Sequence, residues 1–139
     1  MSLNLMKYSH WLKKKLGIKH RLLQGKKGVA ILDYDATWEK ILSIKPSEEN
    51  AIPSAFVDWD NTPRKQERGS VYLGATPVKF KQYFKQLIVK TREEYHQDKI
   101  FVFAWNEWAE GGYLEPDEKF GYGYLRAIKE ALSEANESL

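Results

Sequence analysis

The fold of this chain is decided by the stretch Ile100-Phe101-Val102-Phe103-Ala104-Trp105, a continuous run of apolar residues. A strand buried on both faces of a parallel sheet has this pattern, because neither of its faces meets water. The run therefore predicts a buried strand over 100–105, with Phe103 and Trp105 largely buried. Polar residues follow at once, so a loop is expected over 106–116.

Two shorter apolar runs lie upstream and predict further strands, over 29–32 and 54–59. Segments with helical spacing separate the three runs, and this alternation is typical of parallel βα units. The expected fold class is therefore α/β. The pattern indicates a partial (β/α) barrel, with two or three parallel strands alternating with helices.

Four segments place apolar residues at helical spacing. Helices are expected over 4–23, 35–44, 77–95 and 117–132. Thr76 supplies a capping hydroxyl for the third helix, with Pro77 at its first position. Asp35 and Asp117 are expected to cap the second and the fourth. The side chains expected to face inward are Trp38, Ile41 and Leu42 in the second helix, and Phe120, Tyr124, Leu125, Ile128 and Leu132 in the fourth.

The composition excludes several classes of site. The 139 residues include no cysteine, so disulfides and thiolate metal sites are absent. The three histidines show no metal-ligand spacing, and there is no phosphate-cradling glycine loop. Neither a metal nor a cofactor is therefore expected. No apolar run approaches the roughly 18–20 residues that span a membrane, and the expected location is the cytoplasm.

The charges that sum to a net +3 are unevenly distributed along the chain. Residues 1–32 carry eight Lys or Arg and no acid, whereas the remainder holds 14 basic and 19 acidic residues. We therefore expect a basic amphipathic helical segment over 1–28 and a βα domain over 29–139. The basic segment is either a solvated helix face or a contact with an anionic membrane surface. Nucleic acid is not expected as a partner.

The loop after 100–105 contains Glu107 and Glu110, three residues apart. Active sites of α/β folds gather at the carboxyl ends of strands, and paired carboxylates are the usual equipment of glycoside chemistry. Gly111-Gly112 gives the backbone freedom to turn. Trp105 and Trp108 offer flat faces for a sugar ring. The alternative is a solvated acidic loop with two core tryptophans.

The loop after 54–59 begins Asp58-Trp59-Asp60-Asn61-Thr62-Pro63-Arg64. Asp58 and Asp60 are candidates for binding sugar hydroxyls, and Arg64 for binding an anion. The alternative is a turn in which Arg64 simply pairs with Asp60, because Asp and Asn before Pro are common turn formers.

Four stretches together resemble the WbsX-type family of bacterial polysaccharide-biosynthesis proteins. They are Val57-Asp58-Trp59-Asp60-Asn61-Thr62-Pro63-Arg64, Gly74-Ala75-Thr76-Pro77, Ala104-Trp105-Asn106-Glu107-Trp108-Ala109-Glu110-Gly111-Gly112-Tyr113-Leu114-Glu115-Pro116-Asp117 and Phe120-Gly121-Tyr122-Gly123-Tyr124-Leu125. The resemblance covers residues 33–133. That family is commonly labelled glycosyltransferase and is similar to glycoside hydrolase family 99, which has a (β/α)₈ barrel and an Asn-Glu-Trp-x-Glu-Gly pattern.

The resemblance implies roles for individual residues. Glu107 matches the base that deprotonates the 2-hydroxyl of the sugar to give an anhydro-sugar intermediate, and Glu110 matches the general acid/base at the glycosidic oxygen. The residues expected to bind substrate around this pair are Trp59, Asp60, Arg64, Trp105, Asn106, Trp108, Tyr113 and Glu115.

The expected function is that of the C-terminal part of a carbohydrate-active enzyme. It would act on glycosidic bonds in the biosynthesis of O-antigen, capsule or lipopolysaccharide. We expect this part to be inactive alone, because a whole barrel needs roughly 200–250 residues. The expected partners are a glycan and, because unpaired strand edges invite pairing, a second copy of the chain or the missing half of the barrel. A non-catalytic carbohydrate-binding or scaffold module is the alternative.

Overall fold

The computed structural model describes residues 23–24 and 28–137. The helix expected over 4–23, and with it the basic segment, falls almost entirely outside this part of the chain. The strands are β1 (Leu23–Gln24), β2 (Ala30–Asp33), β3 (Ser54–Phe56), β4 (Ser70–Leu73), β5 (Phe101–Phe103), β6 (Asn106–Glu107) and β7 (Gly112–Tyr113). The helices are α2 (Tyr34–Ser43), α3 (Thr62–Lys65), α4 (Pro77–Glu93) and α5 (Gly123–Glu137), with 3₁₀ turns η1 (Gln66–Arg68) and η2 (Trp108–Glu110).

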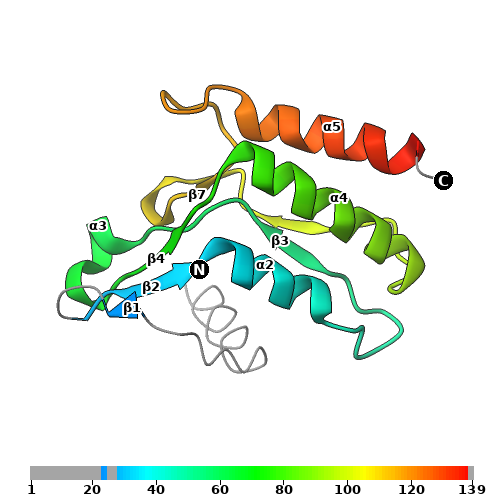
Figure 1. Cartoon of the computed structure of the whole chain (residues 1–139), viewed down its shortest axis with the longest axis horizontal. Coiled ribbons are helices and arrows are strands. Elements are labelled where there is room, and N and C mark those ends of the chain that lie inside the picture. Colours follow the sequence, from blue (N-terminus) through cyan, green and yellow to red (C-terminus); the bar gives the residue numbers. More distant parts are fainter. Residues whose placement is uncertain (1–22, 25–27, 138–139) are drawn as a thin grey trace, which may run out of the picture.

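The described strands form three small sheets (Figure 1). β2 pairs in parallel with β4, and β3 pairs in parallel with β5. β1 pairs antiparallel with β2, and β7 pairs antiparallel with β6. The parallel pairs and the intervening helices confirm the α/β class. Over the described ranges these strands do not close a barrel.

β4 is a strand that the sequence interpretation placed in a loop. Its register against β2 runs from Ser70 opposite Ala30 to Leu73 opposite Asp33. The Asn61 side chain fixes its start, because Asn61 Oδ1 accepts a hydrogen bond of 2.7 Å from the Ser70 amide. Pairing with a strand 40 residues away therefore overrides the loop-like composition of the preceding segment.

The helices begin according to local capping rules, but two of the expected capping residues, Asp35 and Asp117, are not the caps. Thr76 caps α4 as expected, accepting a bond from the Lys79 amide. α2 is capped by Asp33, not by Asp35, and Asp33 Oδ1 accepts from the Ala36 amide at 2.7 Å. Asp117 holds the turn before α5 by accepting from the Phe120 amide, and so does not cap the helix itself.

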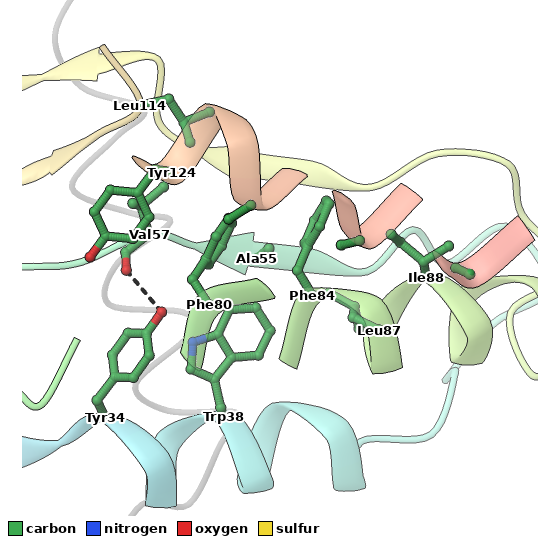
Figure 2. Packing of buried hydrophobic residues seen from close by; sticks show 13 residues of the cluster. Tyr34, Trp38, Ala55, Val57, Phe80, Phe84, Leu87, Ile88, Leu114 and Tyr124 are labelled. Atoms are coloured by element: carbon green, nitrogen blue, oxygen red, sulfur yellow. Dashed lines mark hydrogen bonds between the residues drawn. The ribbon is translucent and has the colours of Figure 1, made fainter. Parts of the chain in front are cut away.

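The core lies between α2, β3, α4 and α5, and Figure 2 shows its aromatic centre. Figure 1 shows α4 and α5 running side by side. α5 turns toward α4 the stripe of small residues Ala127, Ala131 and Ala135, all buried, which permits close approach of the two helices. Leu132, which we expected to face inward, lies off this stripe and is 43% exposed.

The stretch that predicted the main strand forms β5, but it is shorter and less covered than expected. Phe103 is half-buried, whereas Phe101 is 63% exposed and Trp105 is 57% exposed. The prediction that Trp105 is buried is therefore wrong. The physical reason is that the described chain pairs β5 on one edge only, with β3, and Trp105 lies beyond the end of the strand.

Candidate functional site

The two polar loops at the carboxyl ends of β3 and β5 are joined through their backbones. The Asp60 amide donates a hydrogen bond of 2.8 Å to the Glu110 carbonyl. Gly111 follows in the left-handed region with φ of 65°, and a Cβ there would lie 2.8 Å from the Asp60 nitrogen. Only a glycine combines this φ with this approach, so Gly111 brings the two loops together.

Gly112 has a different physical role from Gly111. A Cβ at Gly112 would lie 2.6 Å from Cε1 of Phe103 and 3.2 Å from the Asp58 carbonyl oxygen. The freedom to turn that the sequence suggested for both glycines thus applies to Gly111. Gly112 is needed because β7 packs closely on the ring of Phe103 at the end of β5, and near the backbone that follows β3.

Arg64 and Glu110 form an ion pair between the two loops. Their side chains are 51% and 18% exposed, so Glu110 sits in the less open position. The alternative pairing of Arg64 with Asp60 does not form. Asp60 instead accepts from the amide of Thr62 at 2.8 Å and from its hydroxyl at 2.6 Å, which fixes the start of the short helix that carries Arg64.

An aromatic face lies in the same hairpin as Glu110. The rings of Trp108 and Tyr113 stack with centroids 3.8 Å apart and planes at 15°. Trp108 Nε1 donates to Glu115 Oε2 at 2.6 Å, and Trp108 is 51% exposed. This stack borders an open groove whose lining residues are Trp108, Tyr113, Pro116, Asp117, Glu118 and Lys119. A flat, half-exposed aromatic surface of this kind fits the face of a sugar ring.

The remaining candidates fall into two groups. Asn106 and Glu107 form β6 and pair with Tyr113 and Gly112, so the turn holds Glu107 and Glu110 in one hairpin. Glu107 is half-buried and accepts no side-chain hydrogen bond from the described part of the chain. Trp59 points elsewhere: its ring packs 5.5 Å from that of Phe103, and its Nε1 donates to Ser70 Oγ at 2.9 Å.

The structure places Asp58, already a sequence candidate for binding sugar hydroxyls, beside Gly112 of the hairpin, and it adds Tyr124. Asp58 lies two residues after the end of β3. Burial raises the pKa of its carboxyl, while the Trp59 amide and Lys119 act in the opposite direction. Tyr124, which sequence reasoning placed in the core, is buried beside it. The sequence feature that sets Tyr124 apart is the alternation of glycine and aromatic residues over 120–124. Helical periodicity led us to expect a helix there instead.

The described residues show neither a metal-binding cluster nor a membrane-spanning helix. No group of three or more His, Asp or Glu side chains in residues 23–24 and 28–137 is arranged to hold a metal ion. None of the described helices is long and apolar enough to cross a membrane.

A family described as Glycosyltransferase WbsX matches residues 2–128. The "Uncharacterized protein WxcX" of Xanthomonas campestris pv. campestris, in strains B100 and ATCC 33913, is 37% identical over 86 residues. The match covers 60% of this chain and only 12% of the length of each relative. No solved structure matches.

Proposed function

This chain belongs to the WbsX glycosyltransferase family, and on that premise we propose that it carries the carboxylate pair of a carbohydrate-active enzyme acting on glycosidic bonds. The setting we propose is the biosynthesis of bacterial surface polysaccharide, such as O-antigen, capsule or lipopolysaccharide. The observation that carries this proposal is the hairpin that holds both Glu110, paired with Arg64, and the stack of the half-exposed Trp108 on Tyr113.

In the proposed mechanism the two carboxylates have different proton-transfer roles. Glu110 transfers a proton at the glycosidic oxygen, and Glu107 removes a proton from the 2-hydroxyl of the same sugar, as the similarity to glycoside hydrolase family 99 suggests. Their placement in one hairpin, with η2 between them, supports this division. Trp108 supplies the surface on which the sugar ring stacks.

Arg64 acts on the reaction through Glu110. A guanidinium anchored by a short helix fixes the position of the carboxylate more firmly than a flexible lysine does. We also propose that β3 and β5 are neighbouring strands of a (β/α) barrel, because both end in the site and pair in parallel. In the much longer relatives, other segments would complete the glycan-binding surface.

The proposal is tested by the activity of carboxamide variants. Because this part is expected to be inactive alone, the chain is assayed both by itself and within a longer family member that supplies the missing segments. The readouts are sugar release from mannose- and rhamnose-containing oligosaccharides, and sugar transfer between them. Glu110→Gln and Glu107→Gln are each expected to lower kcat by about 10²–10⁴-fold, because each removes a proton-transfer group. Glu93→Gln, on the exposed face of α4, is the control and keeps the parent rate. Full activity in both site variants would contradict the assignment.

A non-catalytic carbohydrate-binding module remains the second candidate. The observation in its favour is that Trp105 and Trp108 are both more than half exposed, as in a surface that holds a glycan without enclosing it. Saturable binding of an oligosaccharide that no condition converts, with equal affinity in the parent and in Glu110→Gln, would favour this second function.

A further inference from the structure

The indole ring of Trp108 is held by two residues that follow the turn of the hairpin. Its ring stacks on that of Tyr113, with the centroids 3.8 Å apart and the planes at 15°. Its Nε1 donates a hydrogen bond of 2.6 Å to Oε2 of Glu115. Tyr113 and Glu115 are separated by a single residue, so one short segment supplies both contacts.

This segment is itself fixed to the backbone that precedes the hairpin. The Trp105 carbonyl accepts hydrogen bonds from the amide of Leu114, at 2.9 Å, and from the amide of Glu115, at 3.1 Å. The side chain of Leu114 is 8% exposed and belongs to the hydrophobic core. Glu115 therefore reaches Trp108 from a backbone position that the core holds in place.

The stack on Tyr113 does not by itself fix the orientation of the indole. The χ2 torsion of tryptophan is broad and roughly two-fold, so a ring turned over by about 180° would still lie in the same plane. Nε1 would then lie on the opposite edge of the ring, away from Glu115. The hydrogen bond to Glu115 selects one of these two orientations, and a bond to a carboxylate is stronger than a bond to a neutral acceptor.

The ring held in this way presents an apolar surface to the groove. Trp108 is 51% exposed although Tyr113 covers one of its faces, so the exposed surface belongs to the opposite face and the ring edge. Trp108 and Tyr113 both line the groove, whereas Glu115 is not among its lining residues. Because Nε1 is already bonded to Glu115, the indole offers a ligand no free donor.

We propose that Glu115 is a positioning residue for glycan binding, which holds the Trp108 indole in the one orientation that accepts the apolar face of a sugar ring. Sequence reasoning grouped Glu115 with the residues that bind substrate. Its bond to Nε1 and its place outside the groove lining support an action through Trp108 instead. A ring that is already oriented loses less conformational freedom when the sugar binds, so the affinity is higher. That the ligand is a sugar rests on the proposed function.

Binding is measured by two-dimensional NMR titration of the full chain with the methyl glycosides of mannose, rhamnose, galactose and glucose. The reporters are the backbone amide resonances of four residues that line the groove, Tyr113, Asp117, Glu118 and Lys119. At least one glycoside is expected to shift these resonances saturably. Glu115→Leu removes the acceptor at similar volume and is expected to weaken this binding about tenfold. Glu115→Gln keeps an acceptor oxygen and is expected to recover most of the affinity.

The variant Trp108→Phe separates an action through the indole from a direct contact with the sugar. Phenylalanine keeps a flat ring but has no nitrogen that could bond to Glu115. Adding Glu115→Leu to Trp108→Phe is therefore expected to change the affinity by less than about twofold. The matched control is Glu39→Leu, at an exposed position of α2, a helix that contributes no residue to the groove. It is expected to bind the glycoside as the parent does.

Three results would overturn the proposal. An equal loss of affinity from Glu115→Leu in the parent and in Trp108→Phe would show that Glu115 does not act through the indole. Parent-like affinity in Glu115→Leu would show that the bond to Nε1 does not serve glycan binding. The same conclusion follows if no glycoside shifts the groove resonances of the parent. The Nε1–H resonance of Trp108, identified by its absence from Trp108→Phe, is expected to move in Glu115→Leu and to stay in place in Glu39→Leu.

The outcome is distinguishable from failure of the proposed function. In the turnover assay Glu115→Leu is expected to raise KM about tenfold and to keep kcat within about threefold of the parent, because it affects binding and not proton transfer. If Glu107→Gln and Glu110→Gln keep the parent kcat while Glu115→Leu weakens binding through Trp108, the catalytic assignment fails and the positioning role stands. If both site variants lose kcat while Glu115→Leu binds as the parent does, the positioning role fails and the catalytic assignment stands.

Discussion

Trp38 and Trp108 are the same side chain placed in two regions with opposite requirements. Trp38 lies in the core, is 0% exposed, and stacks on Phe56 and on Tyr83 with both centroid distances at 5.6 Å. Trp108 lies in the loop after β5, is half exposed, stacks on Tyr113 and bonds to Glu115. The core uses aromatic rings as packing volume, whereas the loop displays one as a surface.

The core and the loops also differ in the contacts that hold them together. The core depends on close packing between α2, β3, α4 and α5, and this packing tolerates even the Nε1 of Trp38, which has no hydrogen-bond partner among the described residues. The loops depend on a few specific contacts, chiefly the Arg64–Glu110 ion pair and the backbone approach at Gly111. Changes in the core should therefore affect stability, and changes in the loops should affect the site.

The largest effect is expected from the paired variants Trp38→Ala and Trp108→Ala. Trp38→Ala should cost about 3–5 kcal/mol of unfolding free energy, because it leaves a cavity in a closed core. Trp108→Ala should cost less than about 1 kcal/mol, as expected for an exposed residue, while abolishing the sugar-induced shift. Urea denaturation followed by circular dichroism measures both. Equal losses of stability would remove the distinction between the two regions.

A smaller effect is expected at the glycine that joins the two loops. Gly111→Ala forces a Cβ toward the Asp60 nitrogen at positive φ, and should cost about 1–3 kcal/mol. The matched control is Gly121→Ala, which has φ of 53° but no atom near its Cβ, and should cost about 1 kcal/mol. Glycan binding should fall in Gly111→Ala alone. Equal effects of the two variants on stability and binding would contradict the steric argument.

A still smaller effect is expected on the helical side, at the pair of Asp35 with Lys79. Hydrogen bonding from Lys79 is the main cause of the lowered pKa of Asp35. Both side chains are more than a third exposed, so Asp35→Asn should cost about 0.5–1 kcal/mol. The ion pair stabilises above the ordinary Asp pKa of 3.8, and this contribution is lost as the pH falls through the lower folded value. Thermal melts from pH 7 downward check this, and a constant difference at all pH values would refute it.

The smallest effect, of opposite sign, is expected at Asp58. Burial raises the pKa of its carboxyl in the folded state, with Asp60 adding to the rise and the Trp59 amide and Lys119 opposing it. Stability then decreases as the pH rises from the ordinary value of 3.8 through the raised one, because the folded protein binds the proton more tightly. Asp58→Asn should thus melt slightly higher than the parent at pH 7 and lose this advantage in acid. A lower melting temperature at pH 7 would show that the charge is stabilising.

Patterns within a few residues were enough to predict part of this molecule. Thr76-Pro77 begins α4 as expected, and the apolar runs at 29–32, 54–59 and 100–105 each overlap a strand. The polar loops follow the strands β3 and β5 as their composition indicated. Capping and periodicity are properties of neighbouring residues, so a local reading suffices for them.

The sequence by itself therefore indicated the strands β2, β3 and β5, the helices α2, α4 and α5, and the loops that carry the candidate residues. Only the tertiary structure decided that Arg64 pairs with Glu110, 46 residues away, and that Trp105 is exposed while Trp38 is buried. It also decided that Asp33 caps α2, because Asp35 bonds to Lys79 and Tyr83 on α4. Such choices depend on which distant segment arrives beside a residue, and burial and charge pairing are set by those neighbours.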